Sequence, residues 1–467
     1  NGDNVGGAMA WWLRLYWGAI AVILAVFAHL LWRRGTEVAL MPRLKRLPSR
    51  LAGTPGFIMG AAALVAAATG AFIFWNTNIL NDYRTQDDTE ARLAAYERKY
   101  LKYENIPQPS ITAIRLNVDL QPANKRADLT GTYSLVNDSG KSVADLHIRF
   151  ADPDIELLSL AIPGARLVME DRDNNYRIYR LAQPMAPGAT STLAFKTRRW
   201  QQGFRAQGDD TAIIPNGTFL NNSDFAPQIG MDRSGLLQDR VDRRKQGLPA
   251  ELRPAKLEDL SATSRNYVGN ADWVSADITV TTDAGQTPIA PGVRVSDETK
   301  DGRRTARFVS KGPILAFFSI QSAAYAEKTM DADGVKLSVF YHPGHEANVD
   351  TMLNAMKASL DYYRRNFGPY QFDHARIIEF PGYATFAQAF AGTMPYSESI
   401  GFLADTSDEE AINYPAYVTA HEVAHQYWAH QVISSDQQGG TIWVETLAQY
   451  SALMVMKALY GEDKIRR

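Results

Sequence analysis

The sequence predicts a multidomain protein with two transmembrane α-helices, then a β-rich domain, then an α+β domain. Two long apolar stretches lie within the first 75 residues, and apolar residues alternate with polar ones from about residue 110 to residue 325. After residue 328, short strands alternate with segments of helical period. We therefore place a membrane segment at 1–75, a helical stalk or linker at 76–109, the β-rich domain at 110–327 and the α+β domain at 328–467.

Composition excludes several kinds of site. The 49 basic and 51 acidic residues leave a formal net charge of -2, which gives no reason to expect nucleic acid as a partner. The chain has no cysteine, so disulfides and thiolate metal sites are excluded. Any metal must therefore be bound by His, Asp or Glu side chains.

The two ends of the chain predict that it is part of a longer protein. It begins with Asn1 instead of Met, and it stops at Arg467 without a natural ending. We therefore expect further residues on both sides, and an incomplete final domain.

The two apolar stretches, residues 15–32 and 56–75, are long enough to cross a lipid bilayer, which takes roughly 17–25 residues. Two buried core helices are the alternative. The connecting segment contains one acid, Glu37, and six basic residues: Arg33, Arg34, Arg43, Lys45, Arg46 and Arg50. An excess of basic residues marks a cytoplasmic loop. We expect a protein of the cytoplasmic (inner) membrane whose C-terminal part lies on the periplasmic or extracellular side.

Three patterns describe the chain between the membrane and residue 415. Leu93, Tyr96, Tyr100 and Tyr103 recur at helical steps among many charges, which predicts an exposed amphipathic helix. Period-two segments such as ITAIRLNVDL and GPILAFFSIQ predict strands, and the charged run DRVDRRKQG predicts a solvated face or loop. VKLSVFYHP and ARIIEF predict strands on either side of a helix over residues 349–367.

The segment HEVAHQYWAH, residues 421–430, suggests a metal site. Pro415 favours a helix start, and no Gly or Pro interrupts residues 415–432, so we expect one helix there. At about 100° per residue, His421 and His425 lie about 40° apart and can reach one ion. Glu422 lies beside them and can accept a proton from a zinc-bound water. This HExxH arrangement predicts one catalytic Zn2+.

The third ligand must come from elsewhere. On a continuing helix His430 would face away from His421 by about 180°, so we expect a structural or surface role for it. Glu445 lies in the first turn of a predicted helix over residues 443–461, whose apolar stripe we assign to Trp443, Leu447, Tyr450 and Met454. His421, His425 and Glu445 would leave one zinc position open for water.

HEVAHQYWAH followed by WVETLAQY resembles the gluzincin metallopeptidases, most of all the aminopeptidase N (membrane alanyl aminopeptidase) family. The resemblance covers roughly residues 110–467. It implies a saddle-like β-rich domain, a thermolysin-like catalytic domain and peptide substrates. Nineteen residues separate His425 from Glu445, the thermolysin spacing, whereas aminopeptidase N usually has eighteen.

The same family carries a Gly-x-Met-Glu-Asn segment whose Glu binds the substrate's α-amino group. Gly392 and Met394 match this segment, but Pro395 stands where the Glu is expected. The resemblance therefore assigns the amine-binding role to Glu398, with Gly392 and Met394 beside the substrate. This departure puts strict aminopeptidase specificity in question.

Other readings of the chain stay open. Nothing matches the family's downstream transition-state tyrosine, so little activity is expected of this chain alone. The membrane part makes the chain similar to bacterial proteins that join an ABC-transporter permease to an aminopeptidase N-like domain, which implies other transporter subunits as partners. A transport component that binds or senses peptides and a thermolysin-like endopeptidase are the alternatives.

Overall fold

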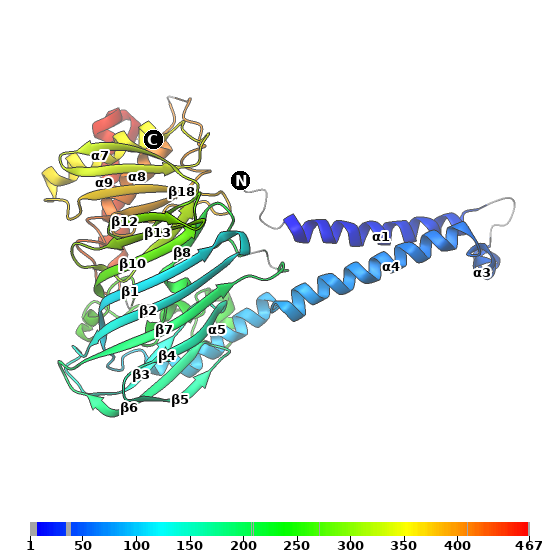
Figure 1. Ribbon diagram of the computed structural model, residues 1–467, viewed down its shortest axis with the longest axis horizontal. Coiled ribbons are helices and arrows are strands. Elements are labelled where there is room, and N and C mark those ends of the chain that lie inside the picture. The colour runs from blue at the N-terminus through cyan, green and yellow to red at the C-terminus, as the bar shows by residue number, and fades with distance from the viewer. Residues whose placement is uncertain are drawn as a thin grey trace. The chain divides into compact units, whose positions relative to one another are not determined.

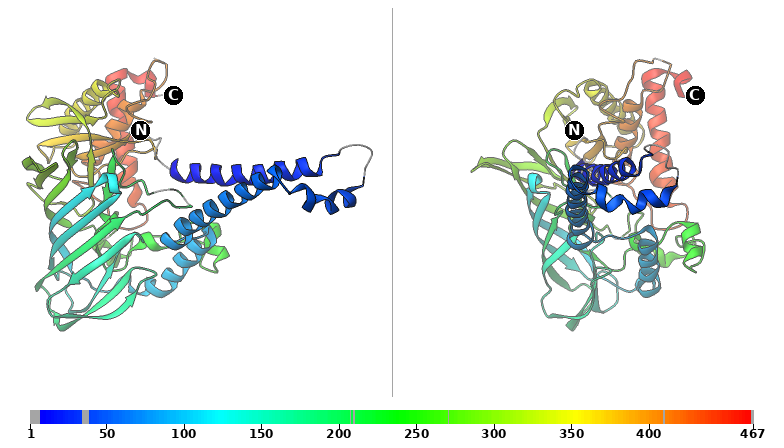
Figure 2. Two further views of the ribbon diagram at one scale, coloured as in Figure 1. Left: turned by 45° about the vertical axis from the view of Figure 1, so that its right-hand side comes forward. Right: turned by 90° about the vertical axis from the view of Figure 1, so that its right-hand side faces the viewer.

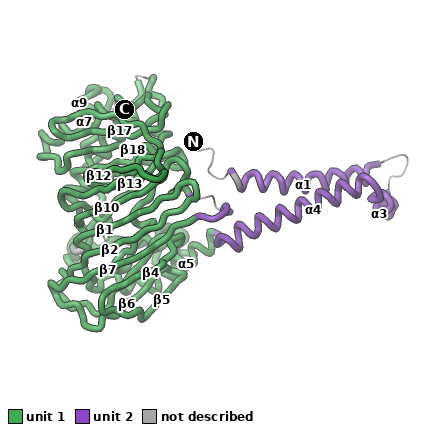
Figure 3. The backbone as a smooth tube through the Cα atoms, in the orientation of Figure 1, with its two compact units in different colours: residues 1, 86–200, 211–467 green, residues 2–85, 201–210 purple. Residues whose placement is uncertain are grey.

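The computed structural model describes residues 7–33, 39–206, 208, 210–269, 271–408 and 410–465. The chain forms two compact units, shown in Figure 3. The helical unit comprises residues 2–85 and 201–210, and the large unit comprises residues 86–200 and 211–467.

The helical unit consists of two long helices joined by two short ones (Figure 1). Its elements are α1 (Gly7–Leu31), α2 (Leu40–Lys45), α3 (Leu47–Arg50), α4 (Thr54–Phe74) and the π-helix η2 (Trp75–Leu80). The ring centroids of Trp12 and Phe72 lie 4.5 Å apart, so α1 packs against α4. Both apolar helices exceed the predicted spans: α1 begins at Gly7, and helical structure continues beyond α4 to Leu80. By length and composition alone, both are able to cross a membrane.

The basic segment between the long helices contains helices α2 and α3, where a loop was expected. Arg43 donates to the carbonyl of Leu31 (2.9 Å), and Arg50 donates to the carbonyl of Leu30 (2.6 Å). Both arginines therefore satisfy carbonyl groups that the end of α1 leaves without helical partners. Arg34 and Glu37, two of the residues that predicted the orientation, lie outside the described residues.

Four sheets form the framework of the large unit. The largest has the order β12-β13-β10-β1-β2-β7-β4, with β14 also paired to β10. Its strands are β1 (Ser110–Gln121), β2 (Arg126–Val136), β4 (Ile155–Ala161), β7 (Thr190–Trp200), β10 (Trp273–Asp283), β12 (Val293–Lys300), β13 (Arg303–Val309) and β14 (Ile314–Leu315). A second sheet, β5-β6-β3-β9, contains β3 (Val143–Arg149), β5 (Ala165–Asp171), β6 (Tyr176–Met185) and β9 (Gln228–Ile229).

A third sheet, β11-β15-β8, contains β8 (Thr218–Asn221), β11 (Thr287–Ile289) and β15 (Ser319–Ala323). The fourth, β16-β17-β18-β19, contains β16 (Ala326–Ala332), β17 (Val335–Tyr341), β18 (His374–Phe380) and β19 (Thr393–Ser397). The helices of the large unit are α5 (Gln86–Tyr100), α6 (Arg240–Lys245), α7 (Val349–Asn366), α8 (Tyr414–His425), the π-helix η8 (Ile442–Thr446), α9 (Leu447–Tyr460) and α10 (Glu462–Ile465). Short 3-10 turns η3 to η7 cover Leu101–Tyr103, Pro122–Asn124, Asn222–Asp224, Arg233–Gly235 and Leu260–Ser264.

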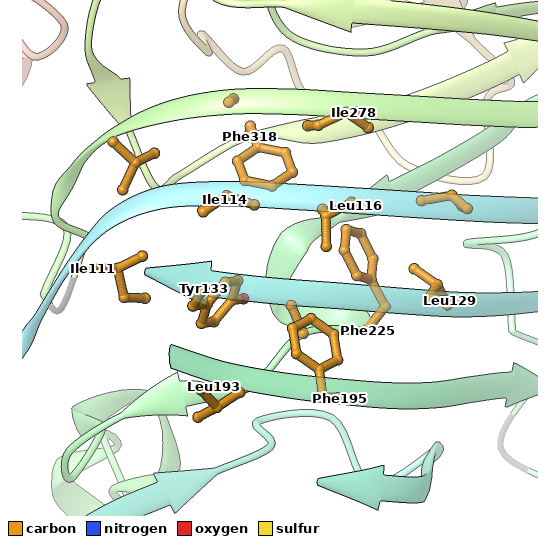
Figure 4. Close-up of a cluster of buried hydrophobic side chains, with 14 of the residues drawn as sticks. Ile111, Ile114, Leu116, Leu129, Tyr133, Leu193, Phe195, Phe225, Ile278 and Phe318 are labelled. Carbon is orange, nitrogen blue, oxygen red and sulfur yellow. The ribbon is translucent and has the colours of Figure 1, made fainter. Parts of the chain in front are cut away.

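Alternating burial places the main core on one face of the largest sheet (Figure 4). Along β1, Ile114, Leu116 and Val118 are buried while the residues between them are more exposed, as period two requires. Gly131 of β2 lies directly under Phe195, because an added Cβ would come within 2.2 Å of the Phe195 ring. The β-rich part therefore has one large core, with smaller clusters beside it such as the one around Tyr176 and Met231.

Two sequence-based expectations fail where charges are buried. The helix expected to be exposed, α5, buries Tyr96, Tyr100 and Glu97 in the large unit. The charged run, expected to be a solvated face or loop, forms α6, and most of it is exposed, but its Arg243 is fully buried. Arg243 Nη1 and Nη2 donate to the two Glu97 oxygens at 2.7 and 2.8 Å. This bidentate pair compensates both buried charges, which a search for apolar periodicity does not detect.

The segment GPILAFFSIQ also differs from its prediction. It forms two short strands in different sheets, β14 and β15, instead of one. The side chain of Asn222 holds the bend between them, because it bonds the carbonyl of Ala316 and the amide of Phe318.

The fourth sheet begins the C-terminal part of the large unit, coloured yellow to red in Figure 2. β16 is antiparallel to β17, whereas β17, β18 and β19 are parallel, so their carboxyl ends lie at one edge. Helices α7, α8 and α9 pack with this sheet around a second core that includes Leu353, Met394 and Val423. The predicted strands VKLSVFYHP and ARIIEF and the predicted helix over 349–367 are confirmed.

Candidate metal centre

Helix α8 carries the first half of the site. The Asn413 side chain accepts from the amide of Ala416 (3.1 Å), and Pro415 occupies the first turn, so the helix start has a cap and a fixed φ. The helix ends at His425, whereas one helix was predicted over 415–432. The structure therefore corrects the prediction at its C-terminal end, where the sequence contains no Gly or Pro to mark a stop.

The structure brings His421, His425 and Glu445 together. The Nε2 atoms of the two histidines are 3.0 Å apart. Glu445 Oε2 lies 3.5 Å from His425 Nε2 and 3.7 Å from His421 Nε2. Among the described residues these three form a group whose ligand atoms all lie within 4.8 Å of one another. Two imidazole nitrogens and one carboxylate oxygen are a donor set that zinc prefers.

The surroundings of the histidines favour metal binding. His425 Nδ1 lies 3.2 Å from the carbonyl oxygen of Trp428, which can only accept, so Nδ1 carries a proton and Nε2 is the nitrogen that faces His421 and Glu445. Burial, and next the charge of His425, lower the pKa of His421 to about 4. His421 is therefore neutral near pH 7, as a metal ligand must be.

Glu422 is buried beside the two histidines. Burial raises the pKa of its carboxyl to about 7, and its Oε2 has no hydrogen-bond partner among the described residues. A buried carboxylate with a free oxygen is able to take up and release a proton.

Glu445 lies in the segment after α8, as predicted, but in a π-helical turn instead of the first turn of an α-helix. It lies in the π-helix η8, and α9 continues from Leu447. The predicted apolar stripe is wrong: the side chains of Trp443 and Tyr450 are 54% and 57% exposed. Small residues such as Ala448 and Ala452 face the core instead, where they permit close packing between α8 and α9. Large apolar residues misled the prediction because helix contacts here use small ones.

His430 is not part of the group formed by His421, His425 and Glu445. The chain has already left α8, and His430 Nε2 lies 3.1 Å from the carbonyl oxygen of Ala389, in the interior. Burial lowers the pKa of His430 to about 4.

Gly392 and Met394 lie at the edge strand β19. Gly392 has a positive φ of 63°, and a Cβ there would come within 2.7 Å of His374 Nε2. Its amide donates to the buried side chain of Gln426 (2.8 Å), which links β19 to the end of α8. Met394 is fully buried in the second core. The structure therefore gives both residues packing roles, and substrate contact for them stays a prediction.

Glu398 follows β19 and lies with two residues that sequence reasoning missed, His345 and Glu379. Its Oε1 accepts from the amide of Gly382 (2.8 Å). Its role in binding an amine stays a prediction. A signal that could have pointed to Glu379 is its charge within the predicted strand ARIIEF, which is otherwise mostly apolar.

No family model matches the chain. The human endoplasmic reticulum aminopeptidase 2 is 30% identical over 134 residues, which cover 28% of this chain and 14% of that protein. The chain thus matches about one seventh of the length of this curated relative.

Solved structures resemble far more of the chain. The M1 zinc metallopeptidase from Deinococcus radiodurans has a TM-score of 0.50 at 15% identity, covering 76% of this chain and 72% of that chain. The fold is that of an M1 zinc metallopeptidase. A mutant of the Deinococcus enzyme bound to the substrate Tyr-Ser-Ala also has a TM-score of 0.50, at 16% identity over 76% of this chain and 72% of that chain. This similarity supports the predicted fold class, and the predicted domain bounds stay predictions.

Proposed function

We propose that this protein is a membrane-anchored zinc aminopeptidase that removes N-terminal residues from peptides outside the cytoplasm. One observation carries the proposal: the convergence of His421 Nε2, His425 Nε2 and Glu445 Oε2, with the buried Glu422 beside them. The M1 fold adds support, as do a relative named as an aminopeptidase and a neighbour bound to a free tripeptide.

His421, His425 and Glu445 would hold one zinc ion, which when bound lowers the pKa of a water and polarises a carbonyl. Glu422 accepts the proton that the attacking water loses, and then donates it to the amine that leaves when the peptide bond breaks. The hydrogen bond from His425 Nδ1 to Trp428 fixes the imidazole orientation throughout. The partly exposed Glu445 leaves this side of the site open to a peptide.

Anchoring rests on α1 and α4 together with the basic residues between them. The excess of basic residues here, Arg43, Lys45, Arg46 and Arg50 among them, supports a cytoplasmic connection and a peptidase part on the periplasmic or extracellular side. The permease context and partner transporter subunits stay predictions.

Cleavage of Tyr-Ser-Ala and of N-acetyl-Tyr-Ser-Ala by the full-length protein in detergent tests the proposal. We expect release of tyrosine from the free peptide only, complete loss of release after treatment with a zinc chelator, and recovery on adding Zn2+. The nineteen-residue spacing between His425 and Glu445 favours an endopeptidase as the second candidate. Equal cleavage of free and acetylated peptides would favour that candidate and contradict the aminopeptidase.

A further inference from the structure

A cavity of about 290 Å³ lies between the fourth sheet and strands β11 to β13 of the β-rich part. Leu337 of β17 and Ile377 of β18 point into the second core, which helices α7, α8 and α9 share. Side chains alternate between the two faces of a strand, so Lys336, Ser338 and Arg376 point to the opposite face, where they line the cavity. The cavity is therefore separated from the proposed metal centre by the thickness of the sheet.

Arg376 brings a buried positive charge to this cavity. Its side chain is only 8% exposed. Its Nη2 lies 3.1 Å from the carbonyl oxygens of Ala290 and Gly292, 3.0 Å from Thr393 Oγ1 and 3.2 Å from His374 Nε2. Burial lowers the pKa of His374 to about 4, so this imidazole is neutral near pH 7. Each of these four partners is thus a neutral group, and none is a carboxylate.

The other charged side chains around the cavity already have partners. Three ion pairs account for them: Lys336 with Glu327, Arg294 with Asp297, and Asp373 with Lys311. Arg376 is the charge that these pairs leave over. A buried charge is costly unless an opposite charge compensates it, so the cavity has an unmet requirement for one negative charge.

The guanidinium of Arg376 also has donors to spare. All four of its hydrogen-bond contacts with the described residues involve Nη2, and the buried Nε has no partner among them. Burial lowers the pKa of Arg376 to about 10, which is the direction expected for a cation without a counter-charge, and the group stays charged near pH 7. An anion in the cavity would supply both the missing charge and the missing acceptor.

We propose that this cavity binds a small carboxylate monoanion, held by the guanidinium of Arg376. Guanidinium and carboxylate match in planarity and charge, and one negative charge balances the one cation left over. The class we expect is an organic acid without an amino group, because the ammonium of a free amino acid would find Glu327 and Asp373 already paired. The bound carboxylate would join β11 and β12 to the fourth sheet.

Thermal unfolding of the full-length protein in detergent tests the proposal, with sodium propionate replacing sodium chloride at constant ionic strength and pH. We expect a saturable rise in the wild-type midpoint of about 2–4 °C. Arg376→Met should abolish this rise. Arg307→Met is the matched control and should keep it, because Arg307 lies on β13 outside the cavity and pairs with Asp277.

A second variant, Val293→Phe, fills the cavity from β12 without changing a charge, and it should also abolish the rise. It decides the question even where Arg376→Met does not fold. The proposal is overturned if the wild type shows no saturable rise, or if the rise persists in Val293→Phe or in folded Arg376→Met.

Two further measurements separate this site from the metal centre, where zinc also binds carboxylates. The rise with propionate should persist in His421→Ala, and its loss there would overturn the proposal. In the same variant, L-alanine, which adds an ammonium group to propionate, should raise the midpoint less than propionate does. A larger rise with L-alanine would contradict the expected class of ligand. None of these outcomes depends on peptidase activity.

Discussion

At the scale of single residues, burial shifts the pKa values of the side chains around the proposed metal centre. Burial favours the neutral forms of His421 and Glu422, while the carbonyl of Trp428 selects the tautomer of His425. His430 has the same side chain five residues beyond the end of α8, and its Nε2 lies 3.1 Å from the carbonyl oxygen of the buried Ala389 instead. Local backbone geometry therefore separates the two proposed metal ligands from a structural histidine within ten residues.

Replacing Glu422 by Gln tests its role as base and acid. Glutamine keeps the size of the side chain but cannot accept a proton, so we expect kcat to fall by about 10²–10⁴ while Zn2+ stoichiometry stays unchanged. His430→Ala is the control for metal binding and should also keep its Zn2+. Turnover at the wild-type rate in Glu422→Gln would remove the assigned role.

His147 makes stability depend on pH far from the metal centre. It is buried in β3, and its Nδ1 lies 2.7 Å from the hydroxyl of Tyr176. Burial lowers its pKa to about 4, below its value of 6.5 in the unfolded chain, so the unfolded state binds more protons between these values. Its contribution to the free energy of unfolding should fall by about 2 kcal/mol from pH 7 to pH 5. His147→Gln should flatten the fall in urea midpoint over this range, and an unchanged slope would contradict the assignment.

At the scale of elements, α5 and α6 are joined by charges. The buried pair of Glu97 and Arg243 links a helix predicted to be exposed with a charged run predicted to be a solvated face or loop. Arg243 also donates to the carbonyls of Leu237 and Pro249, so its guanidinium organises the chain around α6. A highly charged amphipathic helix can therefore bury one face, where an ion pair compensates the charges.

Glu97→Gln should destabilise the protein by about 3–5 kcal/mol, because it leaves a buried guanidinium without its counter-charge. Asp87 and Lys245 provide the matched control, since they pair across the same two helices but are exposed. Asp87→Asn should cost less than about 1 kcal/mol. The urea midpoints of the two variants distinguish these cases. Equal decreases would show that the buried pair contributes no more to the free energy of unfolding than the exposed pair does.

At the scale of the whole molecule, the complete absence of cysteine permits a direct test of topology. Ser49 lies in the basic connection between α1 and α4, and Ser296 lies on the exposed strand β12. In intact cells stripped of any outer membrane, a membrane-impermeant maleimide should label Ser296→Cys and leave Ser49→Cys unlabelled until the membrane is opened. The reverse pattern would place the peptidase part in the cytoplasm.

Sequence patterns predicted this molecule well wherever one periodicity acts alone. The spacing of His421 and His425, the strands of the β-rich domain and the helix over residues 349–367 all follow from local rules. Other features depend on partners distant in sequence, so no local pattern predicts them: the end of α8, the outward face of α9 and the burial of Arg243. The grouping of His345 with Glu379 and Glu398 follows from the parallel pairing of three strands, which spacing along the chain does not reveal.

The parallel pairing of β1 with β10 also has a consequence for biosynthesis. β1 can pair with β2 soon after both are made, but its other edge stays unpaired until β10 has been made. In the folded protein Ala113 of β1 then lies opposite Ser275 of β10. At about 5–20 residues per second, a ribosome needs on the order of ten to thirty seconds to make the roughly 160 residues between them. During that interval the centre of the largest sheet is an open edge, and an open edge can pair with other chains. Chaperone protection of the nascent chain should therefore matter most before residue 283 has emerged, and slower translation upstream of β10 should raise the yield of aggregates.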